Sequence, residues 1–395
     1  MATDRKNPTF EIVAKTTYGL EEILAGELTE IGADDIKVLN RAVRFTGDTD
    51  LLYRSNYCLR TALRILKPIL SASVSNEQQL YDAIRLVRWN DWLDKKGTLA
   101  VDATLMSTHF THSHYVAQKV KDAVVDQFRD RYGMRPSVNI DNPDLRINVH
   151  IAETKLTVSL DSSGDSLHKR GYRVVQGMAN LSEVLASGMI LLTGWKGDTC
   201  FVDPMCGSGT LPIEAAMIAH HIPPGYYRKD FGFMHWPDFR PELLKKIREH
   251  YTPSFLPSVI TYGMDNSPEA VRSSRKNAGS AQLTDHILFQ VCDIEAAKKP
   301  ADRGIAIINP PYGERLVQED LNSLYKRIGD TLKRSFSGFD AWVLSSNKDA
   351  LKCIGLHPSK RITLYNGQLE CKFNRYVLYE GSHKTATNNP AQPMV

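Results

Sequence analysis

Four short apolar runs in the second half of the chain each end in an acidic residue or an asparagine. Apolar runs of this length, each followed by a polar turn, predict buried strands. Helical patterns follow the first two runs, so the chain alternates between strand and helix. Open α/β sheets place their ligands at the carboxyl ends of their strands. The sequence therefore predicts an α/β sheet with a ligand site formed by the four run ends, Asp203, Asp265, Asp293 and Asn309.

The first run, Cys200–Val202, leads into the glycine-rich segment Asp203–Thr210, and a helical pattern begins at Leu211. Gly207 and Gly209 allow the main chain to approach a ligand without a Cβ in the way. The carboxylate of Asp203 is an acceptor suited to an ammonium or hydroxyl group. No Gly-Lys-Ser/Thr follows the glycines and the spacing is not G-x-G-x-x-G, so neither a P-loop nor a pyrophosphate cradle is indicated. A tight turn without a ligand is the alternative.

The second and third runs end in acids that suit a nucleoside. Asp265 closes the second run, where an acid is placed to accept hydrogen bonds from ribose hydroxyls. Asp293 closes the third run and is a candidate acceptor for an adenine amine. Each acid alone is more often a helix cap or a loop residue. Their order along the chain favours the ligand site.

The fourth run, Ile305–Ile308, is followed by Asn309, Pro310, Pro311 and Tyr312. The Asn309 side-chain carbonyl and the Pro310 main-chain carbonyl can accept both hydrogens of an exocyclic amine. Pro311 fixes φ and stiffens the turn, and the ring of Tyr312 offers a face for stacking a base. A proline-rich turn at a strand end is the structural alternative. The pattern indicates recognition of a planar molecule that carries an NH2 group.

The order of these motifs resembles class I S-adenosylmethionine-dependent methyltransferases that methylate amino groups. Two further segments, His168–Arg173 and Ile362–Cys371, narrow the resemblance to the THUMP-containing RNA guanine-N2 methyltransferases, which include bacterial 23S rRNA enzymes. The resemblance covers residues 10–380. It implies a Rossmann-like methyltransferase domain at 166–380, preceded by an α+β region with a ferredoxin-like part at 1–65 and a THUMP domain at 66–165. Residues 381–395 are predicted to be a disordered tail.

The resemblance also assigns roles to individual residues. It implies S-adenosylmethionine as the cofactor and RNA as the partner, with 23S rRNA favoured over tRNA by the whole-chain likeness alone. Asn309, Pro310, Pro311 and Tyr312 are the predicted catalytic residues. The predicted cofactor-binding residues are Asp203, Pro204, Cys206, Gly207, Ser208, Gly209, Thr210, Asp265, Asn266, Asp293 and Ile294.

RNA contact is predicted for the basic and aromatic residues Lys169, Arg170, Tyr172 and Arg173, through phosphate contacts and stacking. Solvated linker charge is the alternative. A second candidate surface is the helix that carries Lys119, Lys121, Arg129 and Arg131, although Asp122, Asp126 and Asp130 balance its charge. In the same region, Leu145–Ile151 and Lys155–Leu160 alternate as a half-buried hairpin with Glu153 and Thr154 at its tip.

Composition places weaker limits on function. The chain has 395 residues, 42% of them hydrophobic, and a net charge of only +4, which is compatible with a polyanion partner without requiring one. Its six cysteines include no C-x-x-C pair, and His109, His112 and His114 lack a neighbouring Cys or carboxylate, so no metal site is predicted. The sequence shows no apolar stretch of membrane-spanning length and no leader, which predicts a cytoplasmic protein.

Two questions stay open from the sequence alone. The insert His220–Pro257 separates the first two cofactor motifs, and its aromatic residues either cap the substrate pocket or form a small core, which we favour. DNA adenine and protein glutamine methyltransferases use the same Asn-Pro-Pro-Tyr chemistry, and a tRNA guanine remains an alternative substrate. The modified nucleotide and the oligomeric state are not indicated.

Overall fold

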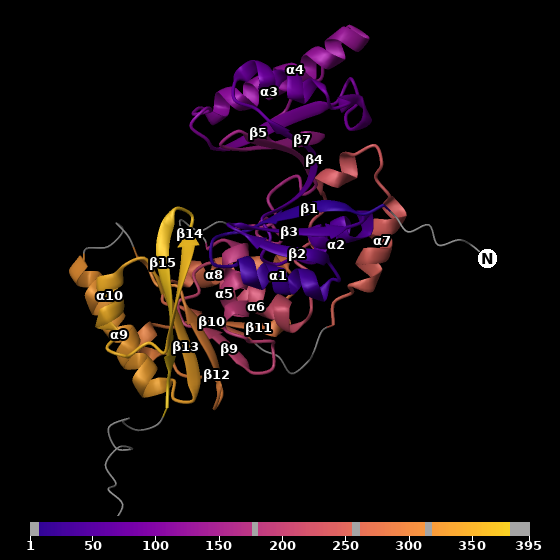
Figure 1. The fold of residues 1–395 in the computed structure, drawn as a ribbon. Coiled ribbons are helices and arrows are strands. Elements are labelled where there is room, and N and C mark those ends of the chain that lie inside the picture. The colour runs from indigo at the N-terminus through magenta and orange to yellow at the C-terminus, as the bar shows by residue number, and fades with distance from the viewer. Residues whose placement is uncertain (1–7, 176–180, 255–260, 313–317, 380–395) are drawn as a thin grey trace, which may run out of the picture. The chain divides into compact units, whose positions relative to one another are not determined.

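The computed structural model describes residues 8–175, 181–254, 261–312 and 318–379. The chain forms two compact units, and Figure 1 labels the helices and strands of both. The N-terminal unit comprises Met1–Arg173, Leu181–Leu192 and His220–Phe255, and the C-terminal unit comprises the remaining segments, Val174–Asn180, Thr193–Ala219 and Leu256–Val395. The predicted tail at 381–395 lies outside the described residues.

The N-terminal unit is built on one eight-stranded sheet with the order β2-β3-β1-β4-β8-β7-β5-β6. The long strand β4 pairs with β1 through Arg64–Leu66 and with β8 through Leu66–Ser73, so it joins the ferredoxin-like part to the expected THUMP part. The strands are β1 (Phe10–Lys15), β2 (Asp34–Leu39), β3 (Ala42–Gly47), β4 (Arg64–Ser73), β5 (Thr98–Met106), β6 (Ser137–Val138), β7 (Leu145–Ala152) and β8 (Lys155–Asp161).

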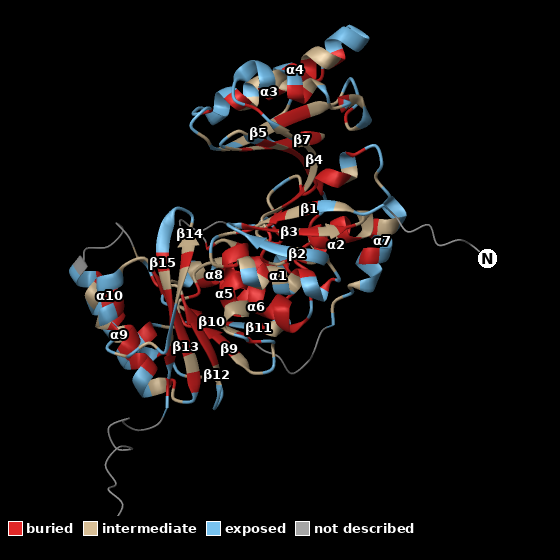
Figure 2. Cartoon of the chain, viewed as in Figure 1, coloured by how far each residue is buried: buried red, intermediate tan, exposed pale blue. Residues whose placement is uncertain are grey.

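The predicted hairpin corresponds to β7 and β8, which pair antiparallel from Ile147–Leu160 to Ala152–Lys155. Glu153 at its tip adopts a positive φ of 50°. Helices accompany the sheet, and those other than α5 (Glu183–Leu192) bury apolar residues in one core, drawn red in Figure 2. They are α1 (Glu21–Glu30), α2 (Thr49–Cys58), α3 (Glu77–Arg85), α4 (Ser113–Tyr132), α5 (Glu183–Leu192) and α7 (Pro241–His250), with short 3-10 turns η1 (Trp89–Asp91) and η2 (Gly232–His235).

The C-terminal unit contains a seven-stranded sheet with the order β11-β10-β9-β12-β13-β15-β14. The first five strands in this order run parallel to one another, and β15 pairs antiparallel with both β13 and β14. This confirms the predicted α/β architecture. The strands are β9 (Cys200–Asp203), β10 (Thr261–Asp265), β11 (Ile287–Val291), β12 (Gly304–Ile308), β13 (Phe339–Ser345), β14 (Lys360–Asn366) and β15 (Leu369–Val377).

Capping residues in the sequence fix where helices of the C-terminal unit begin. Ser267 caps α8 by accepting from the Ala270 N–H, and Pro268 occupies its first turn. Asn347 caps α10 in the same way. The helices are α6 (Thr210–Ala219), α8 (Pro268–Ser280), α9 (Gln318–Ser335) and α10 (Lys348–Cys353), with 3-10 turns η3 (Thr284–His286) and η4 (Ile294–Ala296).

The compact units cut across the predicted domain boundaries. The boundary between residues 65 and 66 falls inside β4, and two segments within 166–380 belong to the N-terminal unit. One is α5, where the Cα of Gly188 packs so close to Leu20 that a Cβ would lie 2.4 Å from a Leu20 methyl. The other is the insert, whose Phe231, Phe233 and Trp236 are buried in the N-terminal core. These aromatic residues are therefore core residues, as we favoured, but they join the large core of the N-terminal unit and do not form a small core of their own.

Candidate active site

The predicted site residues meet at the carboxyl edge of the C-terminal sheet. Strand β9 lies between β10 and β12. After β9 the chain adds β10 and β11 on one side of it, and then crosses to the other side of β9 to form β12. The register pairs Asp203 with Gly263 of β10 and Val202 with Ala306 of β12. Asp203, Asp265 and Asn309 therefore end or follow three neighbouring parallel strands at a topological switch point, the usual ligand position in such sheets.

The glycine-rich turn after β9 has the conformation that only glycine adopts readily. Gly207 and Gly209 have φ values of 54° and 85°. A Cβ on Gly209 would lie 2.8 Å from the Cβ of Ser274, so this glycine allows the turn to pack on α8. A Cβ on Gly207 would meet nothing within 4 Å. The turn is packed against the fold at Gly209 and open at Gly207, as a ligand-binding turn requires.

Asp265 holds this turn in place. Its Oδ2 accepts a 2.9 Å hydrogen bond from the Gly207 N–H, and its Oδ1 accepts one of the same length from the Ser267 N–H. The Cys206 N–H donates to the Met264 carbonyl at 2.7 Å, which adds a main-chain link between the turn and β10. Asn266, the next predicted residue, is exposed.

Asp203 is a buried carboxyl with a single hydrogen bond recorded among the described residues. The residue is 2% exposed, and its Oδ1 accepts from the Met205 N–H at 3.0 Å. Burial raises the pKa of Asp203 well above its usual range, and the negative charge of Asp265 raises it further. No lysine or arginine of the described segments pairs with it. A ligand ammonium group would stabilise the ionised form of this carboxyl.

The residues that follow β11, Asp293 and Ile294, fit their predicted cofactor-binding role only in part. Asp293 is exposed and its Oδ1 accepts from the Glu295 N–H at 2.9 Å, so this oxygen caps η4. The side chain of Ile294 is 4% exposed and belongs to the hydrophobic core. Asp293 thus acts as the turn cap that we weighed as the alternative, while its second oxygen has no hydrogen bond recorded to another described residue. Pro204, Cys206, Ser208 and Thr210 lie on the glycine-rich turn and the start of α6.

Asn309 carries the most informative polar atom of the site. Its Oδ1 is buried and has no hydrogen-bond partner among the residues described. A buried amide oxygen without a partner is costly and rare, because the lost hydration is not replaced. Pro310 is buried and Pro311 is exposed. The arrangement fits an external donor at Asn309, which is what recognition of a substrate amine supplies.

Tyr312 is held by a residue that sequence reasoning did not single out. The Asn366 Nδ2 donates a 2.7 Å hydrogen bond to the Tyr312 hydroxyl from the end of β14. The Tyr325 hydroxyl of α9 lies 3.4 Å from the Pro311 carbonyl and 2.7 Å from the Ser345 hydroxyl. Burial raises the pKa of both tyrosines, so both remain protonated at neutral pH. The only sequence signal for Asn366 was its place in the segment Ile362–Cys371.

In the segment His168–Arg173, the predicted RNA contacts of Arg170 and Tyr172 are wrong. Arg170 is 2% exposed and donates to the carbonyls of Leu167 and Arg60, at 2.8 and 2.6 Å. Tyr172 is fully buried, and Arg173 forms a 2.7 Å ion pair with Glu183. Arg170 and Tyr172 therefore stabilise the interior and cannot contact RNA from these positions. Lys169 is exposed and keeps the predicted role as a proposal.

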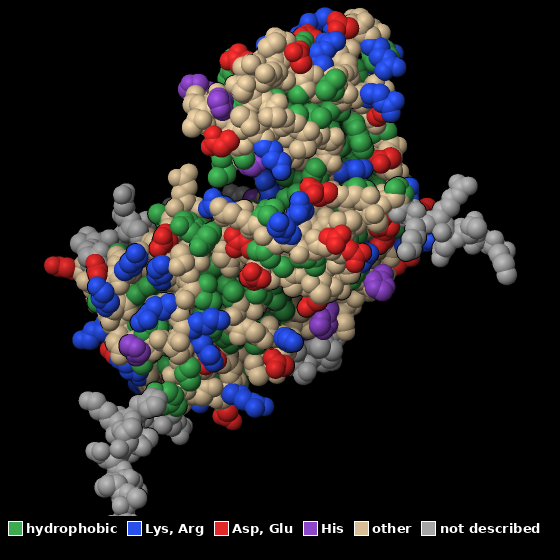
Figure 3. Space-filling view, viewed as in Figure 1, with side chains coloured by type: hydrophobic (Ala, Val, Ile, Leu, Met, Phe, Trp, Pro, Cys, Tyr) green, Lys and Arg blue, Asp and Glu red, His purple; other side chains and the backbone are tan. Residues whose placement is uncertain are grey.

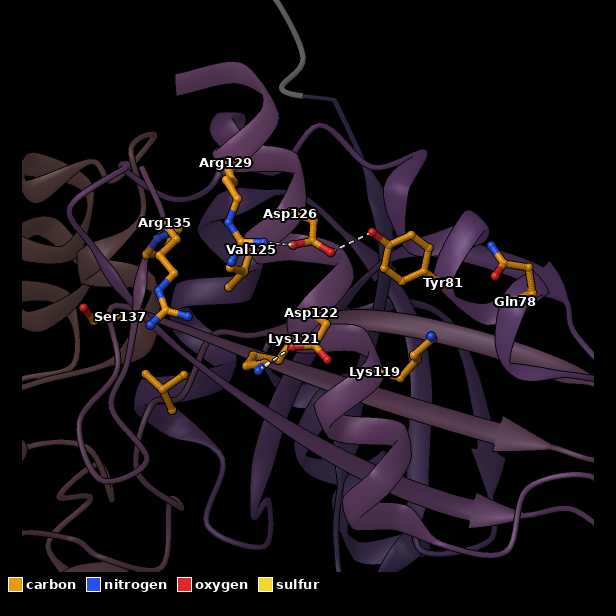
Figure 4. Close-up of a pocket in the computed structure, with 12 residues that line it drawn as sticks. Gln78, Tyr81, Lys119, Lys121, Asp122, Val125, Asp126, Arg129, Arg135 and Ser137 are labelled. Atoms are coloured by element: carbon orange, nitrogen blue, oxygen red, sulfur yellow. Dashed lines mark hydrogen bonds and ion pairs between the residues drawn. The ribbon is translucent and has the colours of Figure 1, made fainter. Parts of the chain in front are cut away.

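Three basic residues of α4, Lys119, Lys121 and Arg129, line a surface cavity of about 690 Å³ (Figure 4), whereas Arg131 donates to the Asn90 Oδ1 at 2.7 Å. Lys121 pairs with Asp122, and Arg129 pairs with Asp126, which also accepts from the Tyr81 hydroxyl. The Lys119 ammonium lies 5.1 Å from the centre of the Tyr81 ring and, like Arg135, forms no ion pair recorded among the described residues. In Figure 3, lysine and arginine side chains are visible around the end of α4 and also around α9 and α10.

The described residues hold neither a metal cluster nor a membrane-spanning helix. They contain no group of three or more His, Cys, Asp or Glu side chains arranged to hold a metal ion. Nor do they include a helix with the length and apolar character needed to cross a membrane. His109, His112 and His114 are exposed at and before the start of α4.

Three family models match consecutive parts of the chain. Residues 11–66 match the RlmL ferredoxin-like domain, residues 74–161 match the THUMP domain, and residues 170–375 match the RMKL-like methyltransferase domain. These matches confirm the predicted order of a ferredoxin-like part, a THUMP domain and a methyltransferase domain.

Similar proteins extend over nearly the whole chain. It is 40% identical over 375 residues to the protein named "Putative RNA methyltransferase slr0064" of Synechocystis sp., covering 94% of this chain and 97% of that one. It is also 40% identical over 380 residues to the ribosomal RNA large subunit methyltransferase K/L of Syntrophotalea carbinolica, covering 93% of this chain. The chain spans about half the length of the K/L relatives it matches, 53% in that case.

A solved structure shows the same fold. The crystal structure of SMU.472, in complex with SAH, superposes with a TM-score of 0.84 at 28% identity and covers 95% of this chain and 99% of that one. The matches to the methyltransferase model over half of the chain, and to relatives at 40% identity over nearly all of it, agree with the site geometry. The chain belongs to the RMKL-like methyltransferase family, with the RlmL-type ferredoxin-like and THUMP domains preceding its methyltransferase domain.

Proposed function

We propose that the protein transfers a methyl group from S-adenosylmethionine to the exocyclic N2 of a guanine in RNA, and that large-subunit ribosomal RNA is the substrate. The buried Oδ1 of Asn309, which has no hydrogen-bond partner among the described residues, carries this proposal from its place at the switch point of the sheet. The K/L relatives are named as large-subunit ribosomal RNA methyltransferases, which supports the choice of RNA. The THUMP domain supports it as well.

The cofactor fits the described residues of the sheet edge. The buried Asp203 carboxyl suits the ammonium group of the methionine part, whose positive charge offsets the cost of ionising a buried acid. Gly207 leaves open space beside the turn. Asp265 still has lone pairs available for ribose hydroxyls after accepting from Gly207 and Ser267, and Asp293 has a second oxygen available for the adenine amine. SMU.472 was solved with SAH, which supports this assignment.

The chemical step places little demand on the protein beyond alignment. S-adenosylmethionine supplies a methyl group already activated by its sulfonium, so in-line positioning of the attacking nitrogen accounts for much of the rate. A guanine N2 is a weak nucleophile, because its lone pair is delocalised into the ring. Asn309 Oδ1 and the Pro310 carbonyl each accept a hydrogen bond from one amine hydrogen, which turns the nitrogen toward a tetrahedral geometry and frees the lone pair. The new N–C bond would form as the bond between sulfur and the methyl group breaks, S-adenosylhomocysteine would leave, and the proton lost by the nitrogen would pass to water. Tyr312 stacks on the base after its extrusion, a step that costs a few kcal/mol.

The THUMP domain supplies the RNA surface in this proposal. Lys119 and Arg135 border the cavity along α4 and form no recorded ion pair among the described residues, so their charges are available to phosphates. Tyr81 offers an aromatic ring next to Lys119, a pairing suited to single-stranded RNA. Lys169 adds an exposed cation before the methyltransferase domain.

One experiment separates this proposal from its competitors. The protein is incubated with S-adenosylmethionine carrying a labelled methyl group and with total RNA from cells that lack the enzyme, and nucleosides from each RNA size class are analysed. We expect labelled N2-methylguanosine in the large ribosomal RNA. Label in tRNA would keep the chemistry and change the substrate. Label only in DNA or protein, tested in parallel, would refute the proposal.

A further inference from the structure

The hairpin of β14 and β15 reaches the Asn-Pro-Pro-Tyr motif through one side chain. Asn366 is the last residue of β14 and pairs in register with Leu369, with Gly367 between them at a φ of 62°. This tight turn fixes the main chain of Asn366, and its half-buried side chain donates from Nδ2 to the Tyr312 hydroxyl at 2.7 Å. The hydrogen bond joins residues 54 positions apart in the sequence.

The direction of this hydrogen bond is set by the chemistry of the two groups. Burial keeps Tyr312 protonated at neutral pH, so its oxygen can accept from the Asn366 Nδ2 and its own hydrogen can be donated to a second group. The neighbouring thiol of Cys371, on β15 and buried, interacts with this hydroxyl. The phenol oxygen of Tyr312 is therefore surrounded by groups from both strands of the hairpin.

A second interaction holds the main chain beside Tyr312. The Tyr325 hydroxyl lies between the Pro311 carbonyl and the Ser345 hydroxyl at the end of β13. Strand β13 also pairs with β15, with Ser345 opposite Lys372, so the same hairpin is tied to the sheet beside this interaction. The main chain of the motif and the tip of the Tyr312 ring are thus held from two separate elements.

We propose that Asn366 is a positioning residue for the methyl-transfer reaction, which acts only through the hydroxyl of Tyr312 and sets the orientation of the ring on which the substrate base stacks. This inference rests on the proposed function. A tyrosine ring turns about two side-chain torsions, and a hydrogen bond at its far end removes that freedom. The Tyr312 ring is then already oriented before the substrate base binds. The entropy cost of ordering this ring is therefore not added to the barrier of the reaction.

A double-mutant cycle tests this pathway. We expect Asn366→Ala and Tyr312→Phe each to lower kcat by roughly threefold to tenfold, the effect of one hydrogen bond of ordinary strength. The double variant should be no slower than either single variant, because both changes remove the same hydrogen bond. Affinity for S-adenosylmethionine, measured by calorimetry, should stay unchanged in all three variants.

The chain offers a matched control. Asn374, on β15, donates from Nδ2 to the Tyr376 hydroxyl at 3.4 Å, and among the described residues Tyr312 is hydrogen-bonded to Asn366 and not to either of these two. Asn374→Ala therefore removes a similar pair from the same hairpin and should lower the melting temperature without changing kcat. Equal losses of kcat in Asn374→Ala and Asn366→Ala would overturn the proposal, since both would then act through the stability of the hairpin. Multiplicative effects of Asn366→Ala and Tyr312→Phe would overturn it as well.

A readout that does not depend on turnover separates this inference from the proposed function. With 3-fluorotyrosine placed at position 312, the ¹⁹F resonance should be a single sharp line in the otherwise unchanged protein and should broaden or split in Asn366→Ala. If the protein methylates DNA or protein instead of RNA, the proposed function fails, and the cycle is then measured on that substrate. An unchanged ¹⁹F line in Asn366→Ala would refute the inference whatever the substrate is.

Discussion

The Gly207 N–H donates a 2.9 Å hydrogen bond to Oδ2 of Asp265, so the acid at the end of β10 fixes the glycine-rich turn that follows β9. The same carboxylate accepts from Ser267 at the start of α8. One side chain therefore orders two loops at the switch point of the sheet. A ligand that binds this edge meets a turn that is already arranged.

This relationship predicts the effect of removing the Asp265 carboxylate. Asp265→Ala loses the link to Gly207 and the proposed acceptor for ribose hydroxyls, and hydrogen bonds to a charged group contribute about 1.5–3 kcal/mol each. We expect the affinity for S-adenosylmethionine to fall by roughly 10- to 100-fold, measured by calorimetry. Glu269→Gln, an exposed change in the first turn of α8, is the control and should bind normally. Normal cofactor affinity in Asp265→Ala would contradict the assignment.

Removing the amide of Asn309 should affect turnover rather than cofactor binding. Its buried Oδ1 has no partner in the described structure, so we assign it an interaction that strengthens in the transition state. Loss of one such group costs about 10²–10³-fold in kcat. We expect Asn309→Ala to show a loss of this size at saturating substrate, with the dissociation constant for S-adenosylmethionine unchanged. A variant that bound cofactor poorly and turned over normally at saturation would assign Asn309 to the cofactor site.

The buried carboxyl of Asp203 predicts a stability that depends on pH. Because burial raises its pKa in the folded protein, the folded state holds this proton more tightly than the unfolded chain does. The stabilising contribution is complete below the unfolded pKa, about 3.9, and is lost as pH rises through the folded pKa. In Asp203→Asn the substituted side chain would be neutral at every pH. Without ligand, the melting temperature of Asp203→Asn should therefore rise relative to that of the unsubstituted protein as pH increases from acid to neutral.

Melting curves of both proteins at several pH values test this expectation. The same substitution should weaken cofactor binding, because the ammonium group loses its anionic partner. Asp285→Asn changes an exposed acid of the same unit and should show no such trend. A melting-temperature difference between Asp203→Asn and the unsubstituted protein that stayed constant across pH would contradict the buried, proton-binding role.

The cavity along α4 predicts a salt-dependent RNA affinity. Lys119→Ala and Arg135→Ala each remove a cation from its lining. Removing a cation that neutralises one RNA phosphate should weaken RNA binding and reduce the slope of log affinity against log salt by roughly 0.7–0.9. Binding is measured by fluorescence anisotropy over a salt series. Lys352→Ala removes an exposed, paired lysine of α10 as the control. Unchanged slopes in Lys119→Ala and Arg135→Ala would place the RNA elsewhere.

The two neighbouring cations Lys169 and Arg170 should differ in how much each contributes to the free energy of unfolding. Arg170→Ala removes the guanidinium donor from the buried hydrogen bond to the Leu167 carbonyl and from the partly buried one to the Arg60 carbonyl, which lowers the free energy of unfolding by about 1–3 kcal/mol. Lys169→Ala removes an exposed ion pair and should change stability by no more than about 1 kcal/mol. Denaturant titration measures both. A larger loss in Lys169→Ala than in Arg170→Ala would reverse the two roles.

Sequence alone determined the features that depend on neighbouring residues. The apolar runs, the glycine-rich turn and the Asn-Pro-Pro-Tyr motif indicated strands and their ends, because strand periodicity and glycine conformation are local properties. The order of the motifs then placed Asp203, Asp265 and Asn309 on one edge of an α/β sheet, where the structure has them. The β7–β8 hairpin was likewise predicted from alternation.

Tertiary structure decided what depends on residues distant in the sequence. The sequence predicted that Arg170 and Tyr172 bind RNA, but both are buried. The burial of the Arg170 guanidinium could not be predicted, because its carbonyl partners are known only from the tertiary structure. The insert joined the N-terminal core because its aromatic side chains stack there, with the Phe233 ring 4.0 Å from that of Tyr53. Asn366 reaches Tyr312 because antiparallel pairing brings the hairpin end to the motif, and no local pattern encodes a hydrogen bond across that distance.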